Sequence, residues 1–297
     1  MTVYGLEYRP KAYTPTGPFQ RLRPLVHSEL HVLFRSKWGI GLYGLCVFPV
    51  LVRLVMLLGY LGLLPLGNQL RETAQALPPE LRLFVPVNIE FYVEQVVRMD
   101  QGFFIMLVLT AMATARAVAK DRATNALELY WTRGIRPSGY FFGKWLGAFL
   151  LVASITVGAP MLLWVIGVMF AADWAFLSDT IGFMPRALAA LAVFTFLLTG
   201  LCLLVSAIAA SANVATILWC LLLGGSSAVA QVISELQGGN AGTSISVWDA
   251  AATLARDVAG IPERGTSTAG ALMLMTGFGV VLGWFARRRL RLSEAIG

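Results

Sequence analysis

Two short patterns in the sequence place reactive residue types at spacings that could support chemistry. His27, Glu29 and His31 give the order H-x-E-x-H, whereas a zinc-binding helix of the common protease type has H-E-x-x-H, and no third ligand is apparent. The run from Gly139 to Lys144 reads G-Y-F-F-G-K, one residue shorter than a phosphate-binding loop and without the Ser or Thr that should follow. Neither pattern predicts a metal, cofactor or nucleotide site in this chain.

The remaining nucleophiles are also poorly placed for catalysis. Cys46, Cys202 and Cys220 lie inside long apolar runs, and none has a C-x-x-C partner, so they predict neither a disulfide framework nor a zinc site. A membrane-embedded hydrolase or acyltransferase needs a nucleophile beside a base or a metal cluster, and the sequence has only two histidines. We therefore expect no catalytic residues, and the chain is predicted not to be an enzyme.

The composition predicts a membrane protein. Of 297 residues, 57% are hydrophobic and 13% are charged, and the mean hydropathy is +0.71. Soluble domains carry roughly 25% charged residues, so this chain cannot supply the polar surface of a soluble enzyme of its size. The net charge of +7 favours contact with anionic membrane lipid, and nucleic acid is not an expected partner.

Six apolar stretches are long enough to cross a hydrocarbon core about 30 Å thick, which takes roughly 20 helical residues. Because backbone groups in lipid must be paired within the chain, each stretch is predicted to be a helix. The predicted fold is an all-α polytopic membrane protein, with a cytoplasmic segment 1–38, a six-helix domain 39–286 and a basic tail 287–297. The predicted spans are 40–64, 101–119, 145–171, 187–209, 213–234 and 268–286.

The distribution of Lys and Arg predicts the orientation of these spans. With both termini in the cytoplasm, sixteen of these residues lie inside and six outside, while five acidic residues lie inside and eleven outside. An excess of Lys and Arg marks cytoplasmic loops. We therefore expect a multi-pass protein of the cell membrane, at the inner or cytoplasmic membrane, with cytoplasmic N- and C-termini.

Helical patterns also occur outside the spans. Residues 21–37 place apolar side chains on one face of a helix and Arg and His side chains on the opposite face. This pattern predicts an amphipathic interfacial helix under the cytoplasmic leaflet. The outer segments 65–100 and 235–267 could form a small cap or could be plain connectors. Within the second of these, residues 246–260 predict a short helix that ends at Gly260 and Pro262.

Arg53 is a charge within the first predicted span. A guanidinium facing lipid there would cost about 2.5–3.5 kcal/mol, so we expect it to face the bundle interior or a subunit interface. Its expected partner is a backbone carbonyl or one of three acids of the first outer segment: Glu90, Glu94 or Asp100. The alternative is an extended side chain that reaches the lipid headgroups.

The segment 119–144 is the most informative part of the cytoplasmic face. Residues 123–132 predict a short amphipathic helix outside the bilayer, with Leu127, Tyr130 and Trp131 on one face. Such a helix could dock into a groove on a partner or could lie on the lipid headgroups. Asp121, Arg122, Glu128 and Arg133 supply charge along the segment.

This segment resembles the signature of ABC transporter permeases of the ABC-2 type. In that family an acidic-Arg pair, an A-L-x-L-Y piece, a proline-containing turn and a Gly-Lys pair join the second and third helices. Matching residues here are Asp121 and Arg122, Ala126 to Tyr130, Pro137, and Gly143 with Lys144. The span pattern, the interfacial helix and the basic tail also match, so the resemblance covers nearly the whole chain. The turn departs from the common R-P-[LI]-S-R order.

The resemblance implies a permease subunit of an exporter, acting as a homodimer or heterodimer of two such subunits. Separate ABC ATPase subunits would bind ATP and Mg and would dock on a cytoplasmic coupling helix. By this resemblance, Leu127, Tyr130 and Trp131 would fill a groove on the ATPase, and Glu128 and Arg133 would pair with charges on its rim. Asp121 and Arg122 would set the angle between the second span and the coupling helix, and Pro137, in the turn that follows, is also expected to take part in the coupling.

Two other classes of membrane protein remain open from the sequence. An ion-coupled secondary transporter usually has acidic or His residues at mid-membrane, and none of the predicted spans contains one. A membrane scaffold that binds an ATPase without moving a substrate would need no such residues. An ATPase gene beside this one would be expected for the permease and the scaffold only.

Overall fold

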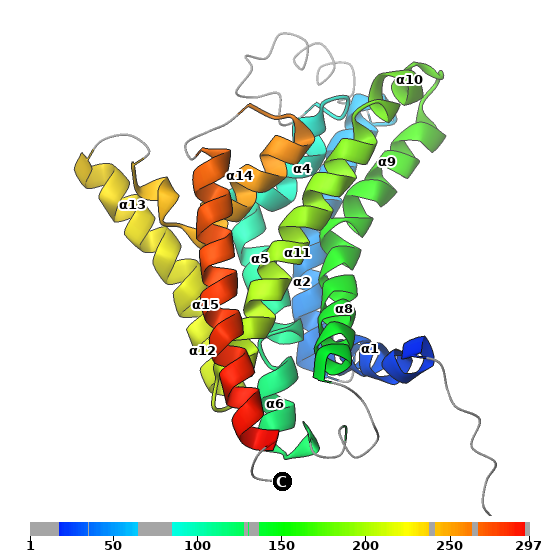
Figure 1. The fold of residues 1–297 in the computed structure, drawn as a ribbon. Helices are drawn as coiled ribbons and strands as arrows, with labels where there is room; N and C mark the ends of the chain where they lie inside the picture. Colours follow the sequence, from blue (N-terminus) through cyan, green and yellow to red (C-terminus); the bar gives the residue numbers. More distant parts are fainter. Residues whose placement is uncertain are drawn as a thin grey trace, which may run out of the picture.

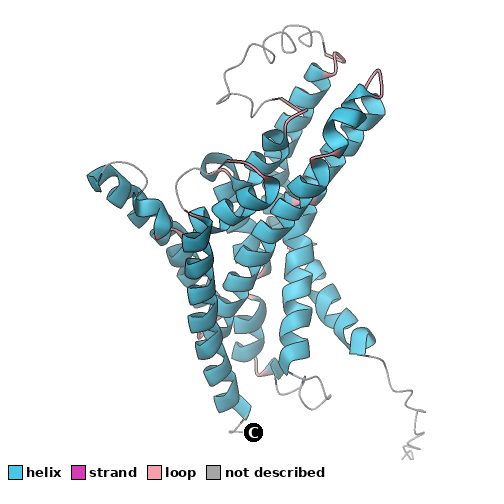
Figure 2. Ribbon diagram, turned by 45° about the horizontal axis from the view of Figure 1, so that its top comes forward, coloured by secondary structure: helices cyan, strands magenta, loops and turns pink. Residues whose placement is uncertain are grey.

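Helices account for the regular structure in the part of the chain that a computed structural model describes, which is residues 18–34, 36–64, 85–127, 130, 137–237, 241–262 and 267–294. Six of these helical stretches are long and apolar enough to cross a membrane. Figure 1 shows them side by side, and Figure 2 shows helices and loops but no strand among the described residues. The prediction of an all-α polytopic membrane protein is confirmed.

The helices follow the predicted order. The second to sixth spans are longer than predicted, whereas the first, predicted as 40–64, is the 24-residue helix Lys37–Tyr60. The elements are α1 (Pro18–Phe34), α2 (Lys37–Tyr60), α4 (Ile89–Val97), α5 (Met99–Ala113), α6 (Ala117–Ala123), α8 (Pro137–Thr156), α9 (Gly158–Phe170), α10 (Ala175–Ile181), α11 (Met184–Ile208), α12 (Ala212–Cys220), the π-helix η2 (Leu221–Gly225), α13 (Ser226–Gln237), the 3-10 helix η3 (Ala241–Ser244), α14 (Val247–Ala259) and α15 (Thr268–Glu294).

Three of the six spans are continuous helices and three are built from consecutive pieces. The second combines α5 and α6, the third combines α8 and α9, and the fifth combines α12, η2 and α13. The third runs over 34 residues, about 51 Å at 1.5 Å per residue, so it is longer than the hydrocarbon core. Lys144 lies in the N-terminal part of this span, before the predicted start at residue 145.

The centre of the bundle is formed by α11 and α5. In the most apolar window of α11, 56% of the residues are buried, against 17% in each of the corresponding windows of α2 and α15. The apolar side chains of α2 and α15 are therefore largely exposed, as expected for helices that face lipid. Residues of α11 and α5 form much of the apolar core, and α11 positions several of the polar groups described below.

The two ends of the bundle differ in their short helices. In Figure 1, α1 lies at a large angle to the spans, at the same end as α6 and the last turns of α15. We call this the α6 end. The opposite end carries α4, α10 and α14 and is called the α14 end. The placement of α1 across the spans agrees with a helix that runs along a membrane surface.

Two short helices are inserted into the α14 end. Residues 91–97 of α4 are all buried, and nine residues of α14 are buried. The sequence predicted the helix of α14 and its end at Gly260, which has the left-handed backbone (φ 74°) that favours glycine. The sequence left open a cap or plain connectors, and the structure shows that parts of both outer segments pack inside the bundle.

Candidate functional site

A buried cluster of charges lies at the α6 end. Lys144 of α8 places its Nζ 2.6 Å from Glu29 Oε1 of α1 and 2.7 Å from Asp121 Oδ2 of α6. The three side chains are 5%, 6% and 14% exposed, so the cluster is nearly closed to water. Residues far apart in the sequence thus connect three helices through one ammonium group.

A tyrosine completes the hydrogen bonding of this cluster. Tyr140, one turn before Lys144 on α8, donates its hydroxyl proton to Asp121 Oδ2 at 2.8 Å. The ammonium group of Lys144 is thus shared between two carboxylates. Burial raises the pKa of Glu29 even though Lys144 lies beside it, because removal of the carboxylate from water outweighs the attraction of the ammonium group.

Arg122, the residue after Asp121, binds the C-terminal end of α11. Arg122 donates hydrogen bonds to the carbonyl oxygens of Ala207 at 2.7 Å and Ala209 at 2.6 Å. These carbonyls lie at the C-terminal end of α11, where backbone acceptors lack partners within the helix and the helix dipole attracts a cation. Consecutive residues of α6 therefore bind α8 through Asp121 and α11 through Arg122.

Helices α6 and α11 are joined by a second set of hydrogen bonds, in which α11 supplies the acceptor and α6 the donors. Ser206 of α11 accepts hydrogen bonds with its Oγ from the backbone N–H groups of Val118 and Ala119, both at 3.1 Å. These are amides of the first turn of α6, which have no acceptor within their own helix. Each helix thus satisfies the terminal backbone groups of the other, and we call the whole arrangement of α1, α6, α8 and α11 the α6-end clamp.

A close helix contact brings α1 to the clamp. A Cβ atom on Gly147 would lie 2.9 Å from the Cβ of Glu29 and 3.0 Å from the carbonyl oxygen of Val26. A contact below 3.0 Å forces a neighbour to shift, so α1 can approach α8 this closely only because residue 147 has no side chain. The glycine therefore allows Glu29 to reach Lys144.

The structure brings together some of the residues that the sequence singled out. Asp121 and Arg122 lie in the clamp, Tyr130 packs its ring 5.3 Å from that of Tyr140, and Pro137 begins α8. Leu127 is only 3% exposed and packs with Leu25 and Tyr140 in a cluster inside the molecule. Its expected role as an anchor in a partner's groove therefore does not fit this structure. The other three residues, Glu128, Trp131 and Arg133, lie outside the described residues.

Arg53 lies inside the bundle, at the α14 end of the molecule. It is 5% exposed, its Nη1 donates to the carbonyl oxygen of Phe91 at 3.1 Å, and its guanidinium carbon lies 4.9 Å from the centre of the Phe91 ring. The charge is therefore in contact with a backbone carbonyl and an aromatic face of α4. Through α4 it lies at the end of the molecule opposite the α6-end clamp, and it does not contribute to the clamp.

Sequence reasoning did not identify Glu29, Tyr140 or Lys144 as partners. Glu29 was considered only as the residue between two histidines, yet it lies seven residues after Leu22 and four after Leu25, on the apolar face of the predicted helix. A carboxylate on an apolar face is the signal that could have predicted a buried partner. Lys144 belongs to two sequence patterns, the G-Y-F-F-G-K run and the Gly-Lys pair, and neither predicts a buried ion pair.

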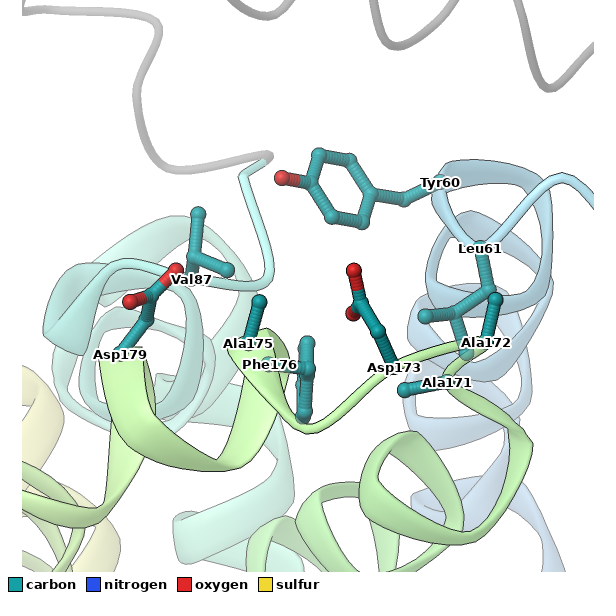
Figure 3. Close-up of a pocket in the computed structure, with 9 residues that line it drawn as sticks. All are labelled: Tyr60, Leu61, Val87, Ala171, Ala172, Asp173, Ala175, Phe176 and Asp179. Atoms are coloured by element: carbon teal, nitrogen blue, oxygen red, sulfur yellow. The ribbon is translucent and has the colours of Figure 1, made fainter.

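Possible ligand sites are sparse in the described part of the chain. No group of three or more His, Cys, Asp or Glu residues there could hold a metal ion, and His27 and His31 form an exposed edge-to-face pair on α1. A pocket of about 120 Å³ at the α14 end is lined by Tyr60, Asp173 and Asp179 with apolar neighbours (Figure 3). This volume is below the roughly 300–1,000 Å³ of ligand pockets, and both carboxylates are exposed.

The contacts of the clamp join four helices through buried charges and terminal backbone groups. Comparison with known proteins agrees with a transport component. A family model described as "ABC-2 family transporter protein" matches residues 23–244, a range that contains every residue of the clamp. No curated protein and no solved structure matches the chain.

Proposed function

The chain belongs to the ABC-2 family of transporter proteins, and from that premise we propose that it is the membrane subunit of an ATP-driven exporter. Two such subunits, identical or similar, would form the substrate pathway. Separate ATPase subunits would bind ATP and Mg on the cytoplasmic side. The complex would lie in the cell membrane with both termini of this chain in the cytoplasm.

The α6-end clamp is the observation that supports this proposal most directly. The segment proposed to contact the ATPase, residues 123–132, begins where α6 ends. The two residues that precede Ala123 bind α8 and α11, and Lys144 extends the connection to α1. A force applied to that segment would therefore reach three other helices through short, buried polar contacts.

We propose that the clamp moves as a rigid unit when the ATPase subunits close. Hydrogen bonds and ion pairs in a buried site hold their geometry better than long exposed side chains do. Displacement of residues 123–132 would then tilt α6, α8, α11 and α1 together. Such a tilt would change the access of the pathway from one side of the membrane to the other.

Membrane lipid is the second proposed contact of this end. Arg23, His27 and His31 are exposed on α1, on the side away from the buried Leu25 and Glu29. A basic, exposed face on a helix that lies across the spans suits anionic headgroups. We propose that α1 rests against the cytoplasmic leaflet while its buried face follows the clamp.

A pair of single substitutions tests the docking of the ATPase. We expect Trp131→Ala to weaken co-purification of the ATPase or its stimulation by the permease, because large aromatic side chains contribute much of the energy of interfaces. Leu127→Ala is the matched control. It removes a buried side chain, so it should lower the free energy of unfolding of the permease by about 2–4 kcal/mol. Binding of the ATPase at moderate temperature should be retained.

The two measurements distinguish the possible outcomes. Normal ATPase binding and normal stimulation in Trp131→Ala, and also in a Tyr130→Ala, Trp131→Ala double variant, would contradict docking at residues 123–132. Binding of the ATPase without any ATP-dependent change in the permease would favour a scaffold instead of a transporter. Transport driven by an ion gradient without an ATPase would exclude the proposal.

A further inference from the structure

A second buried ion pair lies at the α14 end, inside the bundle. Arg256 of α14 donates from Nε to Glu94 Oε1 at 2.7 Å and from Nη2 to Glu94 Oε2 at 2.9 Å. The Glu94 side chain is 2% exposed and that of Arg256 is 13% exposed. Two parallel hydrogen bonds between a guanidinium and a carboxylate fix the relative orientation of their helices, so this pair joins α4 to α14.

Two further contacts hold α4 at its ends. Trp248 of α14 donates from Nε1 to the carbonyl oxygen of Val97 at 3.1 Å, which lies in the last turn of α4. Arg53 of α2 donates to the carbonyl oxygen of Phe91 near the first turn. The short helix is therefore held between α2 and α14 by contacts to its backbone and to one of its carboxylates.

The same helix carries polar atoms that have no partner among the described residues. These buried atoms are Glu90 Oε2, Tyr92 OH and Gln95 Oε1. Tyr92 is fully buried and Gln95 is 2% exposed. A buried polar atom without a hydrogen bond destabilises the conformation that contains it. Three such atoms on a nine-residue helix mean that α4 would gain hydrogen bonds in any conformation that admits water.

An ion pair differs from an apolar contact in having a second favourable state. Glu94 and Arg256 are satisfied by each other in a dry site, and each would be satisfied by water in a wet site. A pair of apolar side chains would lose the favourable free energy of burial on exposure to water and would gain no new partner. Because a buried ion pair adds little stability beyond that of well-packed apolar residues, stability alone does not account for charges at this position.

We propose that α4 lines a water-accessible passage in a second conformation of the protein, and that the Glu94–Arg256 pair is the latch that closes this passage in the conformation described here. Glu94 and Arg256 are then positioning residues, which act by holding α4 against α14. The inference rests on the proposed function, since a transporter must open toward the α14 end at one stage of its cycle.

A cysteine at position 95 can report the opening. In a variant that lacks the three native cysteines, Gln95→Cys places a thiol at a buried position of α4, where Oε1 of Gln95 has no partner among the described residues. A membrane-impermeant thiol reagent is applied to each side of sealed vesicles in turn. We expect slow labelling with the latch intact and an increase of about tenfold or more when Glu94→Gln removes the charge-assisted bonds. The matched control is Asp100→Asn, which breaks the half-exposed Arg98–Asp100 pair near the same end and should leave the rate unchanged.

Two more variants separate opening from unfolding. Leu109→Cys on α5 is fully buried and should stay unlabelled in the Glu94→Gln background if the fold is intact. Exchange of the charges, Glu94→Arg with Arg256→Glu, should restore slow labelling at position 95. An unchanged labelling rate in Glu94→Gln, or labelling of position 109 together with position 95, would overturn the proposal.

Cross-linking tests the latch in the working complex. Glu94→Cys with Arg256→Cys, bridged by a short bis-methanethiosulfonate that forms a disulfide with each thiol and releases sulfinate, should abolish ATP-dependent labelling at position 95, and reduction should restore it. ATP-dependent labelling that persists in the bridged protein would overturn the latch. If ATP never changes labelling but Glu94→Gln still increases it, the latch stands and the proposed ATP-driven function fails.

Discussion

Lys144 has the least replaceable side chain of the α6-end clamp. Its ammonium group separates two buried carboxylates that would otherwise repel each other. Neither carboxylate has an equivalent alternative, because the hydroxyl group of Tyr140 reaches only Asp121. Removal of the shared cation therefore leaves two uncompensated charges at a site that water hardly reaches.

We predict that Lys144→Met destabilises the permease by about 3–5 kcal/mol, the usual cost of removing one partner from a buried ion pair. The measurement is the thermal unfolding of the purified protein. Lys120→Met is the control, since Lys120 is exposed on the neighbouring α6 and should change stability little. Further substitution of Glu29→Gln and Asp121→Asn should recover much of the loss; no recovery would mean that packing of the lysine stem, and not charge, is responsible.

Arg53 gives a second prediction at the residue scale. Arg53→Leu removes a charged hydrogen bond to the carbonyl oxygen of Phe91 and the contact with its ring. We expect a loss of about 1.5–3 kcal/mol in stability, and faster exchange of the amides of α4. Arg98→Leu, at a half-exposed arginine, should have little effect. Equal stability of the Arg53 variant and the wild type would mean that this contact does not hold α4.

Individual residues show where sequence reasoning succeeds and where it stops. The cost of a charge in lipid was sufficient to predict that Arg53 faces inward and that a carbonyl could be its partner. The partner of Glu29 lies 115 residues away in the sequence, and no local pattern encodes such a pairing. For the same reason Glu94 was named only as a possible partner of Arg53, whereas its bonds are to Arg256.

At the scale of elements, Gly147 determines how closely two helices approach. The α1 backbone at Val26 and the Cβ of Glu29 occupy the space that a side chain at position 147 would need. We predict that Gly147→Ala destabilises the permease by about 1–3 kcal/mol through overpacking and also weakens stimulation of the ATPase. Gly277→Ala on α15 is the matched control, because nothing lies within 4 Å of its added Cβ. If both substitutions stabilise equally, the close contact is not required.

The six spans could be predicted because lipid places a simple demand on a helix, namely enough apolar residues to cross. Their ends were predicted less well. Asp121 and Lys144 lie just outside the predicted second and third spans, but they pair with each other and both of their helices continue past them. The burial of α4 and α14 inside the bundle was not predictable. Helical periodicity indicates that a helix has an amphipathic face, but it does not indicate what covers that face.

At the scale of the whole molecule, the two ends use polar contacts differently. The α6-end clamp joins α1, α6, α8 and α11 through contacts in which every named charge has a partner. At the α14 end, α4 combines an ion pair with three polar atoms that lack partners among the described residues. A rigid joint at one end and a separable contact at the other would allow a small tilt at the first to open the second.

An ATPase in the cytoplasm can act on the clamp only if the α6 end faces the cytoplasm. Sixteen Lys and Arg residues fall on that side of the predicted topology and six on the other, and such an excess sets the orientation of short loops. Three separate segments contribute to the excess, so no single loop decides it. We therefore predict that substitution of glutamine for the four arginines of the C-terminal tail leaves the orientation unchanged.

Reporter fusions measure the orientation directly. Fusions after Pro79 and Gly239 should be active with a reporter that works only outside the cytoplasm, and fusions after Asn125 and Gly297 only with a cytoplasmic reporter. The same four results are expected in the tail variant, because residues 1–38 and 116–144 each retain six positive charges. A reversed pair would place the clamp on the outer face, beyond the reach of a cytoplasmic ATPase, and the proposed coupling would then have to be abandoned although the clamp itself would remain.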